Sequence, residues 1–189
     1  VELFGKAFPN DKEPVTIANA TFAIGAFERR LSTPSRFDKF LSGDKAALTA
    51  EEKAGLGAFL AAGCTTCHVG THFGAAMYQK LGLMKPWPNQ KDMGRFTITG
   101  KDGDMMTFKV PTLRNIEKTG PYFHDGSVSS LEQAIILMGR HQLGRELSDA
   151  TAGSIATFLR SLTGTLPADY IKAPELPPST PSTPKPDPA

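Results

Sequence analysis

The two cysteines of this 189-residue chain lie in a single Cys-Thr-Thr-Cys-His sequence, which runs from Cys64 through Cys67 to His68. With no other cysteine in the chain, a framework of disulfides cannot hold the fold together. Stability must come from a hydrophobic core, from a bound cofactor, or from both. The length suits one domain, and 40% hydrophobic with 21% charged residues is an ordinary globular composition.

The spacing of Cys64, Cys67 and His68 is typical of covalent c-type haem attachment. Each of the two thiols can add to one vinyl group of haem, and the histidine is then held under the iron as its proximal ligand. A thioredoxin-like redox motif would need a neighbouring βαβ pattern, and a zinc site would need more Cys or His at ligand spacing. The sequence shows neither pattern. It therefore predicts one covalent haem c and a role in moving electrons.

The motif leaves the second axial ligand of the haem iron open. A thioether ligand would raise the reduction potential relative to a second imidazole, which suits an electron acceptor. In small c-type cytochromes the ligand methionine comes shortly before the final helix, a place that fits Met138, with His141 as its rival. The full set of candidates comprises Met77, Met84, Met93, Met105, Met106, Met138, His72, His124 and His141.

Hydrophobic periodicity predicts a mostly α-helical fold. Apolar residues at spacings of three and four predict a helix over residues 15–31. A capping box, Ser129 with Glu132, predicts a helix that runs to about Met138, and a last helix is expected from a Ser148 cap to Gly164.

The helix that precedes the motif has the clearest local signals. Thr49 and Glu52 form a capping box, which predicts a helix that runs to Ala62. Gly63 would end this helix directly before Cys64. The helix would therefore set the first thiol against the edge of the porphyrin.

Two other segments have distinct patterns. Residues 95–99 and 106–110 alternate with period two around the glycine-containing residues 100–104, which predicts a short β-hairpin. Residues 167–189 are predicted to form a flexible tail, because prolines recur there. These prolines are Pro174, Pro177, Pro178, Pro181, Pro184, Pro186 and Pro188.

The formal net charge of +2 and the scattered basic residues argue against nucleic-acid binding. No apolar run reaches the roughly 20 residues of a membrane helix. The first residues, Val1 to Phe4, do not resemble a signal peptide. Because the chain does not begin with Met, it is expected to be a mature or trimmed product.

Three blocks of the sequence resemble the bacterial dihaem cytochrome c peroxidases. Residues 26–68 resemble the approach to the second haem of that family. Later blocks of the same domain are similar to residues 108–126, FKVPTLRNIEKTGPYFHDG, and 138–144, MGRHQLG. The resemblance also extends to the related enzymes that mature a tryptophan-derived cofactor in methylamine dehydrogenase. It implies a cytochrome c-like domain over residues 1–166, mostly α with a small β-hairpin insertion.

The family has two haem domains, and the chain resembles only the carboxy-terminal one. The amino-terminal domain holds the peroxidatic haem, and the other holds a high-potential haem that accepts electrons from a small cytochrome c or cupredoxin. By this resemblance, His68 is the proximal ligand and Met138 the distal one. The cofactor-maturing relatives carry tyrosine at the position of Met138, so this residue favours the peroxidase branch.

The resemblance also implies a calcium ion between the two domains. Its ligands would include the main-chain carbonyls of Thr119 and Pro121, which are suitable hard ligands. An asparagine of the other domain completes the protein set, and this chain does not contain it. The alternative is that residues 118–121 form a simple turn.

Arg114 and His124 each have two interpretations. Arg114 can pair bidentately with a haem propionate, or it can form a surface salt bridge. His124 and Asp125 invite an acid–base interpretation, but the family places peroxide chemistry in the other domain. His124 is therefore interpreted as structural or as a neighbour of a propionate.

These observations predict the electron-transfer haem domain of a periplasmic cytochrome c peroxidase, because covalent haem is attached outside the bacterial cytoplasm. Its partners would be a small cytochrome c or cupredoxin donor, the peroxidatic haem domain and, in a homodimer, a second copy. With one haem, the chain alone is expected to transfer electrons without reducing peroxide efficiently. The alternatives are a free-standing monohaem cytochrome that shuttles electrons, and a peroxidase in its own right, which requires that Met138 not bind iron.

Overall fold

The computed structural model describes residues 1–176 and 178–185. The chain divides into two compact units, one formed by Thr33–Thr165 and the other by Val1–Ser32 together with Leu166–Ala189. The predicted haem domain over residues 1–166 and the predicted flexibility of residues 167–189 stay predictions. Within that tail, Pro177, Pro186 and Pro188 lie outside the described residues.

Among its described residues, the unit that contains both chain ends has two helices, α1 (Glu2–Ala7) and α2 (Ile17–Glu28). The helix predicted over residues 15–31 is confirmed by α2, in which the Thr16 side chain accepts a hydrogen bond from the Asn19 N–H at 3.1 Å. In the same unit, the Tyr170 ring stacks on Phe27 with 5.0 Å between ring centroids. The Tyr170 hydroxyl also donates a hydrogen bond to the Phe27 carbonyl oxygen.

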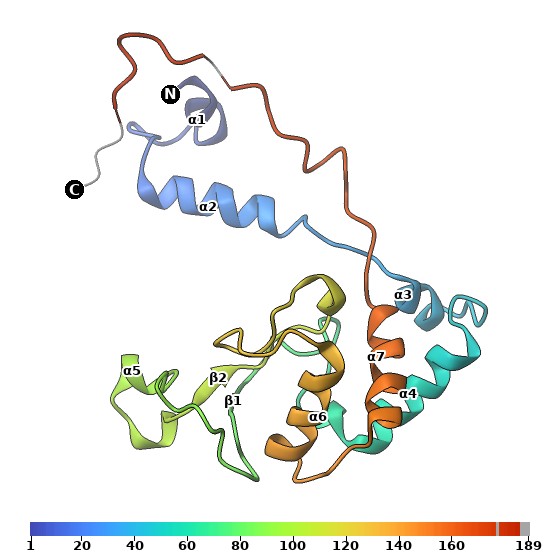
Figure 1. The fold of residues 1–189 in the computed structure, drawn as a ribbon. Coiled ribbons are helices and arrows are strands. Elements are labelled where there is room, and N and C mark those ends of the chain that lie inside the picture. Colours follow the sequence, from blue (N-terminus) through green and yellow to red (C-terminus); the bar gives the residue numbers. More distant parts are fainter. Residues whose placement is uncertain (177, 186–189) are drawn as a thin grey trace. The chain divides into compact units, whose positions relative to one another are not determined.

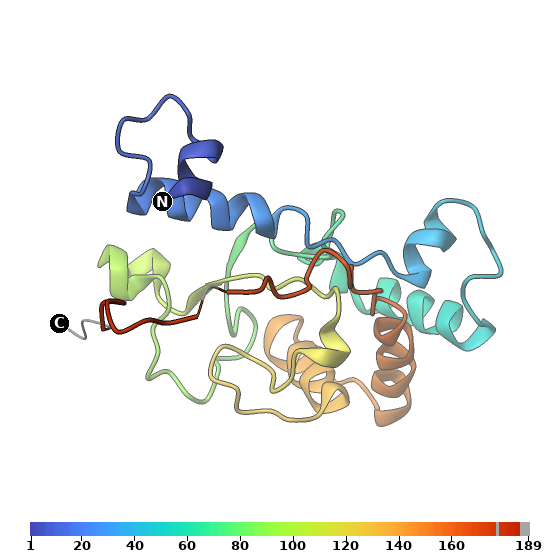
Figure 2. The same ribbon diagram turned by 90° about the horizontal axis from the view of Figure 1, so that it is seen from above.

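The unit formed by residues 33–165 is built around three helices of similar length. Helix α7 (Asp149–Arg160) contacts both α4 (Ala50–Ala62) and α6 (Leu131–Gln142), as Figures 1 and 2 show from two directions. The helices of this unit are α3 (Arg36–Leu41), α4 (Ala50–Ala62), α5 (Phe96–Thr99), α6 (Leu131–Gln142) and α7 (Asp149–Arg160). Three short 3-10 helices span Cys64–Thr66, Asp102–Asp104 and Ile116–Lys118.

The ends of α4 confirm the capping signals in the sequence. Thr49 and Glu52 make both hydrogen bonds of a capping box, and Gly63 ends the helix in a left-handed conformation with φ 90°. The final predicted helix is confirmed by α7, which begins after the Ser148 cap, but it ends at Arg160 and not at Gly164, which forms a β-bridge with Ser35 instead. Helix α6 is capped by Ser130 rather than by the predicted Ser129, because it is the Ser130 side chain that accepts a hydrogen bond from the Gln133 N–H. The helix continues four residues beyond the predicted end at Met138.

The predicted β-hairpin is wrong. Residues 107–109 do form a strand, β2 (Thr107–Lys109), but its antiparallel partner is β1 (Tyr78–Lys80). Residues 96–99 close instead into the single helical turn α5, between Gly94 with φ 61° and Gly100 with φ 62°. Glycine tolerates these positive φ angles, so both ends of the segment can turn away from an extended path.

The core of the larger unit contains a cluster of aromatic rings. Phe158 of α7 lies 5.3 Å from Phe37 and 5.4 Å from Phe59, measured between ring centroids. Phe73, in the loop after the cysteine motif, lies 5.2 Å from Phe37 in an edge-to-face arrangement. The cluster thus joins α3, α4, α7 and the loop after the motif.

The structure is mostly helical with one small two-stranded antiparallel sheet, which confirms the predicted class and is consistent with a cytochrome c-like fold. No helix within residues 1–176 and 178–185 is long and apolar enough to span a membrane.

Candidate functional site

A cavity of about 610 Å³ lies in the larger unit, between the cysteine motif and helices α6 and α7. Its volume is in the range of cofactor-binding cavities. Cys64, Cys67 and His68 line it, and so does Met138 of α6. Much of the remaining wall is apolar, with contributions from Phe59, Leu131, Ile135, Ile155 and Leu159.

The end of α4 directs the motif to this cavity. The left-handed Gly63 turns the chain out of the helix, and the next residues form a single 3-10 turn, Cys64–Thr66. The backbone N–H groups of Cys67 and His68 both donate to the Cys64 carbonyl oxygen, at 3.3 and 3.0 Å. This compact turn brings all three motif side chains to one cavity wall.

The two thiols are not joined in a disulfide. Burial raises the pKa of the Cys64 thiol to about 11. A redox-active CxxC pair needs the opposite, because the reactive form is a thiolate with a lowered pKa. Across the described residues, no cluster of three or more His, Cys, Asp and Glu side chains could hold a metal ion. The thioredoxin-like and zinc interpretations therefore gain no support from the structure.

His68 is held in one ring orientation by the backbone. Its Nδ1 atom lies 3.2 Å from the Phe73 carbonyl oxygen. A carbonyl only accepts hydrogen bonds, so Nδ1 must carry the proton, and Nε2 of the neutral ring is then left with a lone pair for a metal. Burial is the main cause that lowers the pKa of His68, which favours this neutral form.

The structure separates the two rival ligands, Met138 and His141. Within the described chain, Met138 is the one methionine of six that lines the cavity with His68. His141 lines a different cavity, of about 270 Å³, and its Nδ1 atom lies 3.0 Å from the carbonyl oxygens of Lys85 and Pro86. His141 is thus tied to the backbone away from the motif.

His124 lies on the wall of the larger cavity, and its ring stacks on Phe108 with 4.2 Å between centroids. Both ring nitrogens are buried, and neither has a hydrogen-bond partner among the described residues. A buried polar group of this kind needs a partner. The orphaned nitrogens therefore fit a polar group of a bound cofactor, such as a propionate. The sequence pattern draws attention to His124, but it does not indicate that the two ring nitrogens lack hydrogen-bond partners among the described residues.

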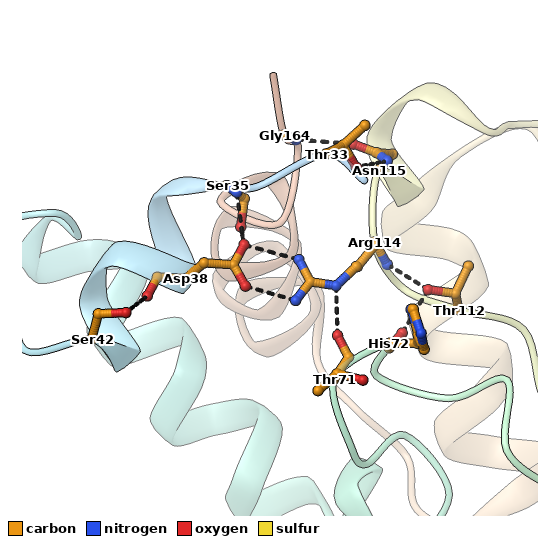
Figure 3. Close-up of polar contacts among 10 residues, drawn as sticks. All are labelled: Thr33, Ser35, Asp38, Ser42, Thr71, His72, Thr112, Arg114, Asn115 and Gly164. Carbon is orange, nitrogen blue, oxygen red and sulfur yellow. Dashed lines mark hydrogen bonds and ion pairs between the residues drawn. The ribbon is translucent and has the colours of Figure 1, made fainter. Parts of the chain in front are cut away.

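Arg114 also borders the cavity, but its guanidinium is bound elsewhere (Figure 3). Nη1 and Nη2 donate to the two carboxylate oxygens of Asp38 at 2.9 and 2.7 Å, and Nε donates to the Thr71 carbonyl oxygen. A contact between Arg114 and a propionate stays a prediction. It would have to use N–H groups that Asp38 and Thr71 leave free.

Thr119 and Pro121, the predicted calcium ligands, line the same cavity. Their carbonyl oxygens accept no hydrogen bond from the part of the chain that the structure describes. Both oxygens thus remain available to another donor or to a cation, and calcium binding stays a prediction.

Known proteins resemble this chain along nearly its whole length. The model of the family described as di-haem cytochrome c peroxidase matches residues 1–46. The cytochrome c551 peroxidase of Nitrosomonas europaea is 48% identical over 97% of this chain and 54% of its own length. That of Pseudomonas aeruginosa is 42% identical over 98% of this chain and 55% of its own length.

More distant relatives extend the likeness. The methylamine utilization protein MauG of Methylorubrum extorquens is 34% identical over 70% of this chain and 37% of its own length. The crystal structure of a MauG-like protein associated with microbial copper homeostasis matches with a TM-score of 0.70 and 30% identity, over 86% of this chain and 58% of that one. The chain spans about half the length of the two cytochrome c551 peroxidases. With the cysteine motif and its cavity in place, these likenesses show that the chain belongs to the dihaem cytochrome c peroxidase family.

Proposed function

We propose that this chain is the electron-transfer haem c domain of a bacterial cytochrome c peroxidase. Cys64 and Cys67 would hold one haem through thioether bonds, and His68 and Met138 would bind its iron. The observation that carries the proposal is that these four side chains line one largely apolar cavity of about 610 Å³.

When bound, the haem supplies the exchange of a single electron at iron. The chain supplies the surroundings that make this exchange selective. The hydrogen bond from His68 to the Phe73 carbonyl fixes the tautomer that leaves Nε2 for iron. The Met138 thioether is a softer donor than imidazole and would raise the potential. The apolar wall of the cavity excludes water, which further tunes the potential.

In the whole protein, a small cytochrome c or cupredoxin would deliver electrons to this domain in the periplasm. The domain would pass them to a peroxidatic haem domain, where hydrogen peroxide is reduced to water. The relatives named cytochrome c551 peroxidase support this assignment, since they align with almost all of this chain and are about twice as long. The free carbonyls of Thr119 and Pro121 would contribute to a calcium site between the domains.

The visible spectrum of the haem-loaded chain tests the proposal. With His68 and Met138 on iron, the oxidised protein shows a weak far-red charge-transfer band from methionine to ferric iron. Met138→Ala should abolish this band. Met84→Ala is the matched control, because Met84 is 61% exposed and does not line the cavity, and it should leave the band unchanged.

Other spectra would overturn the ligand assignment. A high-spin spectrum in the unmodified chain would mean an open iron, and a peroxidase in its own right would become the better reading. A low-spin spectrum without the far-red band, unchanged by Met138→Ala but altered by His141→Ala, would assign the second iron ligand to His141. Lack of covalent haem in the purified chain would reject the proposal as a whole.

A further inference from the structure

The loop that follows the motif has an unusual backbone. Phe73, Gly74 and Ala75 have consecutive positive φ angles of 49°, 123° and 63°. For residues other than glycine, this left-handed conformation is unfavourable. Such a backbone persists only where its surroundings hold it. The same loop provides the carbonyl that orients His68, so whatever holds the loop also bears on the proximal ligand.

One segment, residues 112–114, holds the loop through three successive carbonyls, of which Figure 3 shows those of Thr71 and His72. The Thr112 hydroxyl donates to the His72 carbonyl oxygen at 2.5 Å, and Arg114 Nε donates to that of Thr71 at 2.5 Å. The Leu113 N–H donates to the Phe73 carbonyl oxygen at 3.1 Å. This last oxygen is also the acceptor for His68.

Arg114 is in turn fixed by Asp38 of α3. The two carboxylate oxygens accept from Nη1 and Nη2, and one of them also accepts from the N–H and the hydroxyl of Ser35, at 2.7 and 2.8 Å. The Arg114 hydrogen bond is the main cause that holds the pKa of the Asp38 carboxyl well below its usual range. The carboxylate therefore stays charged and in place at any ordinary pH.

Helix α3 makes a second contact with the loop, through Phe37, the residue next to Asp38. Phe37 is buried, and its ring contacts the ring of Phe73 at 5.2 Å between centroids. The backbone of the loop is thus held by the Asp38–Arg114 pair and its side chain by Phe37. Both contacts start from one short helix.

We propose that the Asp38–Arg114 ion pair is a positioning device for His68, which sets the reduction potential of the haem through the carbonyls of residues 71–73. The inference rests on the proposed function, because it requires a haem iron bound by His68. A hydrogen bond from Nδ1 to a carbonyl makes the imidazole a stronger donor to the metal. A stronger donor stabilises ferric over ferrous iron, so the intact network keeps the potential lower than a loosened one.

The test is the midpoint potential of the haem-loaded 189-residue chain, measured by spectroelectrochemical titration. Arg114→Gln should raise the reduction potential, because it removes the paired hydrogen bonds to the Asp38 carboxylate and the hydrogen bond to the Thr71 carbonyl oxygen. Arg114→Lys should raise the potential by less than Arg114→Gln does. Lysine keeps the positive charge but cannot form the two parallel hydrogen bonds of a guanidinium. Thr112→Val, a milder change at an exposed residue, should shift the potential in the same direction by less.

The matched control is Arg36→Gln. Arg36 makes a comparable bidentate pair from the same helix to Glu52, but it does not contact residues 71–73. This variant should lower the free energy of unfolding without moving the potential.

Two results would overturn the inference. One is an unchanged potential in both Arg114→Gln and Thr112→Val. The other is an equal shift in Arg36→Gln, which would mark a general loosening of the fold. The haem content of the unmodified chain separates this failure from that of the proposed function. Covalent haem with unmoved potentials rejects only the positioning role, whereas a chain without covalent haem rejects both.

Discussion

Gly55 of α4 lies so close to Ser154 of α7 that a Cβ atom at position 55 would stand 2.1 Å from the Ser154 carbonyl oxygen. The same atom would lie 2.9 Å from Cβ of Phe158, in the aromatic core. Only a residue without a side chain allows this approach. Because α4 leads directly into Cys64, the contact also sets where the motif stands relative to the cavity.

Gly55→Ala should therefore destabilise the protein by roughly 1–3 kcal/mol, the usual cost of overpacking a core. Gly57→Ala is the matched control, because it lies on the same helix and a Cβ there meets nothing within 4 Å. It should stabilise the helix by about 0.5–1 kcal/mol. Urea denaturation measures both. Equal effects of the two substitutions would show that the helices can separate without cost.

Glu52 makes stability depend on pH. Its carboxylate accepts hydrogen bonds from the Arg36 guanidinium and from the Thr49 N–H, and the Arg36 bond is the main cause that lowers the pKa of Glu52. The unfolded chain takes up this proton near pH 4.3, and the folded chain only at lower pH. The contribution of Glu52 is therefore complete above the unfolded pKa and is lost as the pH falls through the folded one.

The substitution Glu52→Gln removes this titration and keeps the shape of the side chain. The variant should be less stable than the unmodified protein at pH 7, and the difference should shrink as the pH falls below about 4. The free energy of unfolding, measured between pH 2.5 and 7, tests this. A constant difference across the range would mean that the ion pair does not contribute as described.

His124 should have opposite effects with and without haem. In a Cys64→Ala/Cys67→Ala background, which cannot attach haem, His124→Phe removes two buried unpaired nitrogens and keeps the ring against Phe108. The free energy of unfolding should rise by about 1–3 kcal/mol, the usual penalty of an unsatisfied buried group. In the haem-loaded chain the same substitution would remove the proposed hydrogen bond from His124 to a haem propionate and should lower stability. Thermal unfolding of the two forms gives the comparison, and a change of the same sign in both would contradict the assigned role.

The sequence was most informative where the signals are local. The capping box of Thr49 and Glu52 and the terminal Gly63 each involve neighbours in the chain, and α4 begins and ends where they predict. The prediction of a β-hairpin was wrong, because the strand at residues 107–109 pairs with residues 78–80 and not with residues 95–99. Alternation with period two at 95–99 cannot show which distant segment provides the hydrogen bonds.

The candidate site divides in the same way. The motif from Cys64 to His68 is contiguous, so its chemistry could be read directly. Asp38 and Arg114 are 76 residues apart, and nothing in either neighbourhood predicts their pairing. The unpaired state of His124 was equally hidden, because it depends on every group that surrounds the ring. Such properties come from packing, and a sequence pattern does not contain them.

The place of Cys64 and Cys67 on the cavity wall has a consequence for Met138. Once two thioether bonds tether a haem there, axial ligation becomes an intramolecular event, with an effective concentration of ligand that dilution cannot lower. A neutral thioether is a weak donor, and as a free molecule it would compete poorly with water for iron. With the proposed haem bound to this wall, the tether would decide the competition, so Met138 would stay on the iron as a weak ligand and the potential would be high.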